Sequence, residues 1–576
     1  MNTGFIWPVR SALFRESTDR HDTTVHLVLI ALDGKIAIIL FTQLASGHLD
    51  TVLLEIRGQP ASWAKTNARC AGSLEAPVLA GNLGAVFGQV ALSRGNYHAI
   101  ETNSGAFSYD WLIRAAMSVR NCLCSRPDYV PGASVALLLS NSAEYLAAFY
   151  GTLLADCVVV PLPVASGRQW REKIYEECRP FALISRVEDL KRKTCDSVDV
   201  TLSLSDEPNQ EITIPKLIRR DGDLAMLLFT SGSTGLPKGV MLSHENLLAN
   251  TNSILRELPI RPNDRVLCIL PFCHAFGNSI LQTHILSGAT LLLFGSLPFP
   301  NLIVDAMRDW RATTFSAVPE FYRMLLNYGR LRNRVPETLR YMTIAGGKLR
   351  EDLCLEVADQ IAPAKFYVMY GQSEATARLA LLAPNQLYSR PGSIGKPIYG
   401  VEFRIVDECN RTLPPGVVGM LSARGRNIMR GYWCDPAATA QVLTNDGWLR
   451  TGDLAHCDDA GYYFLHGRAN LLVKIQGYRV HPAEIESIVE EGCPDVAAVA
   501  IPVAHNEETR FVLFLTGRDG RRVELESVRT ICQRELPSYK LPVHFELLDQ
   551  FPLTVGQKVD RAALEVLGRR LIRPAA

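Results

Sequence analysis

The chain has 576 residues, several times the ~150 residues of a typical domain, so we expect at least two domains and exclude a lone binding module. Hydrophobic residues make up 47% and charged residues 21%, which is ordinary globular composition and excludes a disordered, collagen-like or coiled-coil chain. Because 60 Lys and Arg residues balance 59 Asp and Glu residues, the overall charge favours neither nucleic acid nor an anionic membrane as a partner. Any bound anion therefore needs a local site.

The first 85 residues carry no motif, and we expect them to form an N-terminal extension of unknown role. Their most apolar stretch, His26–Ala45, is interrupted near its middle by Asp33, Gly34 and Lys35. A membrane span needs about 20 nearly uninterrupted apolar residues, so this stretch predicts two strands joined by an Asp-Gly turn rather than a transmembrane segment. The basic N-terminus is not followed by a hydrophobic core with a cleavage site, so no signal peptide is predicted.

The 14 cysteines are scattered from Cys70 to Cys532 without C-x-x-C pairs or metal-like clusters. A chain of this length does not need disulfides for stability. The pattern therefore favours reduced, mostly buried thiols over a disulfide framework or a metal site. Together with the missing span and signal peptide, it predicts a cytoplasmic protein.

The middle of the chain, Val135–Phe464, alternates β-branched runs with amphipathic helical segments. This alternation predicts α/β layers with largely parallel strands. A second unit is expected after Gly467, where strand, helix, two strands and another helix follow within about 110 residues, as in a small α+β domain. A cleft between two domains is a common place for small-molecule chemistry.

A polar loop follows the buried-strand pattern LAMLLFT and precedes a helix that should start after Ser243. Its glycines let the backbone N–H groups approach an anion, while its hydroxyls and Lys238 add donors and a positive charge, which is chemistry for a polyphosphate. The spacing is not that of the P-loop NTPases, because Lys238 is followed by Gly239. A flexible linker is the alternative interpretation, but it does not explain a proline and a lysine fixed at this place.

The loop TSGSTGLPKGVMLSH resembles the signature loop of the acyl-adenylate-forming superfamily, and further motifs follow in family order, so the resemblance covers roughly residues 90–570. It implies an α/β large AMP-binding domain of layered sheets and helices over residues 86–467, a hinge at 468–470 and a small α+β lid domain over 471–576. The ATP-binding residues that it implies in the loop are Thr230, Ser231, Gly232, Ser233, Thr234, Gly235 and Lys238.

Two further segments resemble the nucleotide contacts of that superfamily. The first is Y-G-Q-S-E, where the resemblance places Tyr370 on the adenine, Ser373 near the α-phosphate and Glu374 on Mg²⁺; Gly371 and Gln372 complete it. A carboxylate beside a phosphate is sensible only with a divalent cation between them. The second segment is T-G-D followed by G-R. Here the resemblance implies that Asp453 accepts hydrogen bonds from the ribose hydroxyls and that Arg468 contacts ribose or phosphate.

The segment Phe551–Arg561 resembles the superfamily motif whose lysine bridges the carboxylate and the α-phosphate, which implies that Lys558 is catalytic. This chain has Gly-Gln-Lys where Gly-Lys is usual. The resemblance also implies a later rotation of the small domain, with Gly477 in a tunnel for the thiol and Lys474 in the second step. The hinge position is Asn470 instead of the usual Asp or Lys, and Met420 replaces a common Glu.

The segment Pro271–Gly277 resembles the wall of the superfamily's acyl pocket. Cys273 stands where ligases for α-amino acids have an aspartate, and a buried ammonium without a partner is costly, so an α-amino acid is not expected. His274 is expected in the acyl pocket, although a purely structural histidine is the alternative. The other expected pocket residues are Gly346, Gly347 and Ala375, with Thr376 and Ala377 beside the last; their small side chains leave room for a ring or an alkyl chain.

The resemblance implies a ligase that needs ATP and Mg²⁺, forms acyl-AMP and pyrophosphate from a fatty or aryl acid, and transfers the acyl group to a thiol. The thiol belongs to coenzyme A or to a phosphopantetheinyl carrier protein. The catalytic residues implied are Lys558, Glu374, Lys238 and Lys474. The alternative hypothesis is a nucleotide-binding homologue that has lost thioester formation and acts as a sensor or scaffold, suggested by Asn470, Met420 and the Gly-Gln shift.

Overall fold

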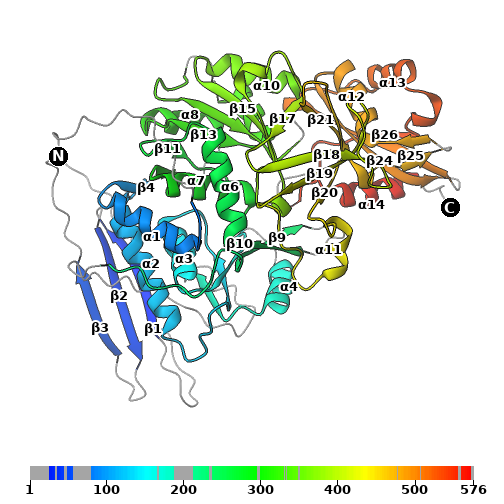
Figure 1. Ribbon diagram of the computed structural model, residues 1–576. Coiled ribbons are helices and arrows are strands. Elements are labelled where there is room, and N and C mark those ends of the chain that lie inside the picture. The colour runs from blue at the N-terminus through cyan, green and yellow to red at the C-terminus, as the bar shows by residue number, and fades with distance from the viewer. Residues whose placement is uncertain are drawn as a thin grey trace, which may run out of the picture. The chain divides into compact units, whose positions relative to one another are not determined.

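The computed structural model describes residues 25–32, 35–43, 49–55 and 79–572, the last range without 165–167, 187–211, 232–236, 295–298, 330, 332–333, 348–349, 472, 476–477, 506–507 and 555–558 (Figure 1). The chain separates into two compact units, Met1–Asn67 and Ala68–Ala576. The finer division of residues 86–576 into a large domain, a hinge and a lid stays a prediction.

The first unit contains a three-stranded antiparallel sheet, β1 (Val25–Leu32), β2 (Lys35–Gln43) and β3 (Leu49–Glu55), in that order. Leu32 pairs with Lys35, so β1 and β2 are joined across two residues. The predicted pair of strands is confirmed, whereas β3 was not predicted. The remaining residues of the expected N-terminal extension, apart from 79–85, lie outside the described part of the chain.

A five-stranded sheet carries the predicted phosphate loop. The strand order is β10-β9-β7-β6-β8; β10 and β9 pair antiparallel, and the others pair parallel. The apolar runs expected as strands do form them, because each is short, rich in Val, Leu and Ile, and almost wholly buried. The strands are β6 (Ser134–Leu138), β7 (Val158–Pro161), β8 (Ala182–Ser185), β9 (Leu224–Ser231) and β10 (Pro237–Ser243).

The second sheet of this unit has 13 strands, in the order β18-β19-β20-β21-β17-β16-β15-β14-β13-β11-β12-β4-β5. The part from β15 to β4 is parallel, and the strands on either side of it pair antiparallel, so the sheet is mixed. The strands are β4 (His98–Thr102), β5 (Gly105–Ser108), β11 (Arg265–Leu267), β12 (Thr290–Leu293), β13 (Thr314–Ala317), β14 (Tyr341–Ile344), β15 (Lys365–Tyr370), β16 (Ala380–Leu382), β17 (Ser393–Pro397), β18 (Val401–Val406), β19 (Gly419–Gly425), β20 (Leu449–Cys457) and β21 (Tyr463–Arg468).

Helices cover both faces of the parallel part of this sheet (Figure 1). Successive residues of one strand point to opposite faces, and Val266 accordingly belongs to one apolar cluster with α1–α3, α6 and α7, whereas Leu267 belongs to a second cluster with α8–α10. The helices are α1 (Leu83–Arg94), α2 (Tyr109–Cys124), α3 (Ala143–Leu154), α4 (Arg168–Cys178), α6 (His244–Glu257), α7 (Ala275–Ser287), α8 (Pro300–Asp309), α9 (Pro319–Asn327), α10 (Glu351–Ile361) and α11 (Pro436–Val442).

The helix expected after Ser243 begins there for a local reason. The Ser243 hydroxyl accepts a hydrogen bond from the Asn246 backbone N–H at 3.1 Å, and the Asn246 side chain accepts one from the Ser243 N–H at 2.9 Å. This reciprocal pair satisfies two backbone donors that the first helical turn leaves open. The same asparagine donates to the carbonyls of Arg426 and Ile428, which ties the start of α6 to a distant loop.

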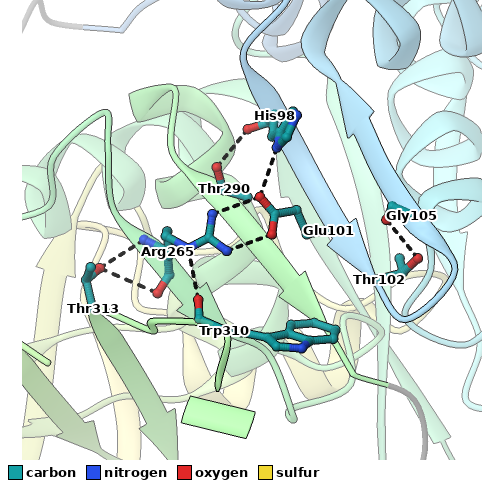
Figure 2. A network of polar contacts seen from close by, with 8 residues as sticks. All are labelled: His98, Glu101, Thr102, Gly105, Arg265, Thr290, Trp310 and Thr313. Carbon is teal, nitrogen blue, oxygen red and sulfur yellow. Dashed lines mark hydrogen bonds and ion pairs between the residues drawn. The ribbon is translucent and has the colours of Figure 1, made fainter. Parts of the chain in front are cut away.

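An ion pair joins β4 and β11 near one edge of the 13-stranded sheet (Figure 2). Both terminal nitrogens of Arg265 donate to the Glu101 carboxylate, at 2.8 and 2.6 Å, and its Nε donates to the Trp310 carbonyl at 3.0 Å. The hydrogen bond from Arg265 lowers the pKa of Glu101 below the ordinary carboxyl value, against the opposing effect of burial. Two parallel charge-assisted bonds to one carboxylate fix the relative position of the two strands.

Replacing Arg265 with methionine is expected to lower the free energy of unfolding at pH 7 by about 1–3 kcal/mol, because a partly buried carboxylate loses its partner. The loss should shrink at acidic pH, since a carboxylate with a lowered folded-state pKa stabilises the protein above the unfolded pKa of about 4 and loses that effect as the pH falls further. Urea denaturation measures both. Arg424→Met is the control: its pair with Glu402 is exposed, so a change below about 1 kcal/mol is expected. Equal losses in both variants would contradict the assignment.

The C-terminal elements form a small α+β layer as the sequence predicted. In β24, Ala498 and Ala500 face a cluster with α12 and α13, while Val499 and Ile501 face α14 on the other side. The elements are β22 (Val473–Ile475), β23 (Tyr478–Val480), α12 (Pro482–Gly492), β24 (Val496–His505), β25 (Glu508–Gly517), α13 (Leu525–Glu535), β26 (His544–Leu547) and α14 (Arg561–Leu571). The strand order β24-β25-β26 combines an antiparallel and a parallel pair.

Within the described residues, no helix has both the length and the apolar character needed to cross a membrane. The cysteines that the structure describes, from Cys122 to Cys532, are free thiols.

Candidate active site

Three of the predicted nucleotide-binding residues, which lie on three different strands, meet in one place. Tyr370 is the last residue of β15, and its buried hydroxyl donates to Asp453 Oδ2 at 2.5 Å. Asp453 lies on β20 opposite Arg468, the last residue of β21, whose Nε lies 2.9 Å from Asp453 Oδ1. Burial, together with the neighbouring Asp453 carboxylate, raises the pKa of Tyr370 well above its ordinary value, so the hydroxyl remains a donor. Residues from motifs that lie far apart in the sequence thus form one cluster in the structure.

The part of β20 that precedes Asp453 helps to hold this residue in place. The Thr451 hydroxyl donates to the Leu421 carbonyl at 2.8 Å and accepts the Asp453 N–H at 3.1 Å, while Arg468 Nη1 donates to the Thr451 carbonyl at 3.0 Å. Gly452 adopts φ +76°, a conformation that residues with a side chain rarely adopt. Tyr370 contacts Oδ2 of Asp453 and Arg468 contacts Oδ1, and an ionised carboxylate with about four lone-pair sites suits an acceptor of two hydroxyl groups.

A second cluster joins the phosphate loop to the metal-binding candidate. Glu374 lies in a 3₁₀ turn, Ser373–Ala375, directly after Tyr370 and the intervening Gly371 and Gln372. The Tyr432 hydroxyl donates to Glu374 Oε1 at 2.8 Å, and Lys238 Nζ lies 5.1 Å from the centre of the Tyr432 ring. Tyr432 was not among the predicted residues; the only local signal was an aromatic pair after Gly431. Tyr432 therefore contacts Lys238 through its ring and Glu374 through its hydroxyl.

The backbone around Glu374 is strained and held from a neighbouring segment. Thr376 has φ +66°, uncommon for a residue with a β-carbon, and its hydroxyl donates to the Asn427 carbonyl at 2.7 Å. Asn427 in turn donates to the carbonyls of Ala375 and Arg378, and the Glu374 carbonyl accepts the Met429 N–H at 2.9 Å. Gly371 has no room for a side chain, since an added Cβ would lie 1.6 Å from the Ala377 carbonyl oxygen. The turn is therefore fixed independently of a ligand.

The phosphate loop differs from the expectation at its far end. The sequence predicted a loop that runs directly into a helix, but Pro237–Ser243 forms β10, which pairs antiparallel with β9 before α6 begins. In this register Lys238 lies opposite Thr230, so the two strands on either side of the loop are direct neighbours. The run of β-prone residues after Gly239 explains the added strand. Gly232, Ser233, Thr234 and Gly235 lie outside the described residues, as does the side chain of Ser231.

The residues expected to bind the acyl group lie on three elements. His274 is the N-terminal cap residue of α7, and Phe276 is the second residue of that helix. Gly346, two residues after the end of β14, adopts φ +92°, and a Cβ added there would lie 3.8 Å from Phe276 Cδ1. A Cβ at Gly347 would lie 3.2 Å from the Pro319 side chain, and Ala375 is fully buried. The structure thus brings Gly346 beside the segment that contains His274.

Several predicted residues lie outside the described part of the chain. Lys558 and Gly477 are among them, as are the side chains of Lys474 on β22 and of Asn470, which belongs to the short 3₁₀ turn Ala469–Leu471. Their roles stay predictions. Next to this turn, His481 accepts the Ala483 N–H at Nδ1, so its Nε2–H donates to the Arg468 carbonyl at 2.7 Å.

The donor set fits Mg²⁺ bound through a nucleotide better than a dedicated metal cage. No group of three or more His, Cys, Asp or Glu side chains able to hold a metal occurs among the described residues. Mg²⁺ usually takes one or two carboxylates together with substrate phosphates, and Glu374, beside Lys238 and Tyr432, is a carboxylate of that kind.

The AMP-binding enzyme family matches residues 87–433, which is more than half of the chain. The chain belongs to the AMP-binding enzyme family. A curated relative, feruloyl-CoA synthase of an Amycolatopsis species, is 29% identical over 488 residues, covering 82% of this chain and 96% of its own. The indoleacetate–CoA ligase of Aromatoleum aromaticum is 30% identical, covering 74% of this chain and 86% of its own. The crystal structure of ATP-bound MatB from Rhodopseudomonas palustris has a TM-score of 0.76 at 26% identity, covering 85% of this chain and all of that one.

Family membership confirms the predicted fold, a large α/β region of layered sheets and helices with a smaller α+β region after it. It also identifies the chain as an AMP-forming acid–thiol ligase of the acyl-adenylate-forming superfamily.

Proposed function

We propose that this AMP-binding enzyme activates a fatty or aryl carboxylic acid with ATP and Mg²⁺, releases pyrophosphate, and transfers the acyl group of the acyl-AMP to a thiol. The observation that carries the proposal is the meeting of Tyr370, Asp453 and Arg468 in one cluster. That cluster supplies an aromatic ring, an acceptor for hydroxyls and a cation, which match the parts of an adenosine nucleotide. Of the two candidate thiols, we favour coenzyme A as the acceptor, because the names of both curated relatives described above include CoA.

The first step joins two anions, because the carboxylate of the acid attacks the α-phosphate of ATP. Positive groups must offset their repulsion inside a site of low dielectric constant. Lys238 and the backbone N–H groups of the phosphate loop would bind the triphosphate, and Lys558 would bridge the carboxylate and the α-phosphate. Most of the catalysis then consists of positioning and charge stabilisation.

Glu374 would hold the Mg²⁺ ion, which supplies charge neutralisation for the phosphate oxygens when bound. Tyr432 keeps one oxygen of Glu374 in a fixed direction through its hydrogen bond. Because burial and then the adjacent Glu374 raise the pKa of Tyr432, the phenol remains protonated and donates at neutral pH.

Replacing Asp453 with alanine is expected to raise the KM for ATP by about 10–100-fold, because the ribose hydroxyls lose a charged acceptor worth about 1.5–3 kcal/mol. Steady-state kinetics at varied ATP measures the effect. Tyr370→Phe is the matched control: it keeps the ring and removes only the hydroxyl that donates to Asp453, so the KM should change by less than about tenfold. An unchanged KM for ATP in the alanine variant would contradict the role of Asp453.

The second step is tested by thioester formation. The enzyme with ATP, Mg²⁺ and an accepted acid should convert coenzyme A into acyl-CoA, detected by mass spectrometry, and a holo carrier protein in a parallel reaction identifies the other candidate acceptor. If acyl-AMP is trapped by hydroxylamine but neither thiol reacts, the acceptor half of the proposal fails. If ATP binds but no hydroxamate forms with any acid, the nucleotide-binding homologue becomes the better account.

A cytoplasmic location also stays a proposal, consistent with the free thiols among the described residues.

A further inference from the structure

Arg378 is a buried arginine four residues after Glu374, and its surroundings are unusual for a cation. It is 4% exposed, its guanidinium carbon lies 4.1 Å from the centre of the Phe276 ring, and its Nε donates to Met369 Sδ at 3.1 Å. Within the described part of the chain, no carboxylate forms an ion pair with Arg378, and no oxygen accepts a hydrogen bond from its side chain. A sulfur atom and an aromatic face are weak partners for a charge.

Two other arginines that are buried or half-buried, Arg340 and Arg171, are partnered by oxygen. Arg340 pairs with the buried Asp264, and the side chain of Arg171 donates to the Val164 carbonyl at 3.3 Å. A buried charge without such a partner is costly, and natural proteins rarely retain one without a use. Burial lowers the pKa of Arg378 to about 9, so the guanidinium still carries its charge at neutral pH.

The position of Arg378 is fixed by its backbone. The carbonyl accepts hydrogen bonds from the side-chain amides of Asn250 at 2.8 Å and Asn427 at 3.0 Å. Asn427 is the residue that also anchors the turn after Glu374. Arg378 therefore belongs to the same anchored segment as Glu374, the residue expected to bind Mg²⁺, and follows it by four residues.

Its guanidinium contacts the segment that is expected to form one wall of the acyl pocket. Phe276, over which it stacks, follows His274 by two residues, and the same ring lies 3.8 Å from a Cβ added at Gly346. Met369, its other contact, belongs to a buried apolar cluster with Ala345. Arg378 thus stacks on the same Phe276 ring that lies next to Gly346, one of the residues expected to bind the acyl group.

We propose that Arg378 binds a second anionic group, a carboxylate or a sulfonate, at the far end of the acid that this enzyme activates. The inference rests on the proposed function and narrows its substrate class from fatty or aryl acids in general to acids with two anionic ends. A guanidinium presents a planar fork of N–H donors that binds a carboxylate or sulfonate through two parallel bonds. The Phe276 ring and Met369 hold the fork in place without neutralising it, and the substrate anion supplies the missing partner.

The test compares acids that differ only at the far end. Dicarboxylic acids of increasing length, aliphatic and aromatic, are assayed beside their monomethyl esters by acid-dependent pyrophosphate release from the full-length enzyme. The best diacid should exceed its own half-ester in kcat/KM by on the order of 10²-fold, because a site built for a buried polar group strongly rejects the analogue that lacks it. Sulfonated acids of the same length form a second arm and identify which anion is preferred.

Variants of Arg378 separate recognition from folding. Arg378→Met, similar in shape and uncharged, should reduce kcat/KM for the best diacid by on the order of 10²-fold and leave or improve that for its half-ester, so the preference reverses. Arg378→Lys keeps the charge but not the fork and should retain part of the preference. Arg171→Met, which removes a buried arginine elsewhere, should leave the preference unchanged. An unchanged KM for ATP shows that the Arg378 variants are folded.

Two outcomes overturn the inference. If the wild-type enzyme uses half-esters or monocarboxylic acids as well as it uses diacids, Arg378 does not select a second anion. If Arg378→Met lowers activity with diacids and half-esters by the same factor, the arginine is structural. Pyrophosphate release with none of the acids, monocarboxylic acids included, would instead overturn the proposed function itself, so the two failures are distinguishable.

Discussion

Replacing Lys558 with alanine is expected to lower the rate of acyl-AMP formation by about 10²–10³-fold, the range seen when one group that stabilises transition-state charge is removed. The reason is electrostatic: Lys558 is the cation proposed to lie between the attacking carboxylate and the α-phosphate. Pyrophosphate release in single-turnover reactions measures this rate, with ATP and acid saturating so that weaker binding does not contribute.

A second readout separates the two half-reactions of the Lys558 variant. When preformed acyl-AMP and coenzyme A are supplied, the variant should form the thioester within about threefold of the wild-type rate, since the lysine is proposed to act in adenylation alone. Lys540→Ala is the matched control from the same C-terminal region, because Lys540 pairs with Glu484 and has no proposed role in the reaction. Adenylation at the full rate without Lys558 would contradict the mechanism.

Replacing Glu374 with glutamine is expected to lower kcat/KM for adenylation by on the order of 10²-fold and to shift the Mg²⁺ dependence to higher concentrations. Glutamine keeps the shape of the side chain, and its amide oxygen can still accept the hydrogen bond from the Tyr432 hydroxyl, so the local fold should persist. What is lost is the negative charge that binds the cation. Initial rates over a series of Mg²⁺ concentrations measure both effects.

Tyr432→Phe is the control for the Glu374 variant. It keeps the carboxylate and the ring near Lys238 but removes the hydrogen bond to Oε1, so a decrease of less than about tenfold is expected. If Glu374→Gln shows the wild-type dependence on Mg²⁺, Glu374 does not hold the cation. If Tyr432→Phe is as damaging as Glu374→Gln, positioning rather than charge is the main contribution of Glu374.

Local sequence signals predicted those parts of the fold that local physics determines. The helix after Ser243 was predicted from its cap, and the strand ending at Tyr370 from a short β-branched and aromatic run. The strand β10 was missed, because glycines and a proline next to Lys238 indicate a loop, and only pairing with β9 reveals the strand. Propensity alone did not contain that long-range partner.

The candidate site also contains residues that local motifs predicted and residues that only the folded structure reveals. Tyr370, Asp453 and Arg468 were predicted because each lies in a recognisable motif, and the structure adds that they touch. Tyr432 and Arg378 were missed. A tyrosine among polar residues gives no signal of its own, and an arginine in an ordinary segment is usually solvated. Their proposed roles depend on what folding places beside them, which is Glu374 for one and Phe276 for the other.

The central claim, that the chain forms an acyl-adenylate from ATP and a carboxylic acid, is tested most directly by acid-dependent exchange of labelled pyrophosphate into ATP. This measurement needs no thiol and no knowledge of the acceptor. With a panel of monocarboxylic and dicarboxylic acids, we expect exchange that requires both Mg²⁺ and an accepted acid and that falls to near background in Lys558→Ala. Exchange that is absent with every acid, although ATP binds, would contradict the account.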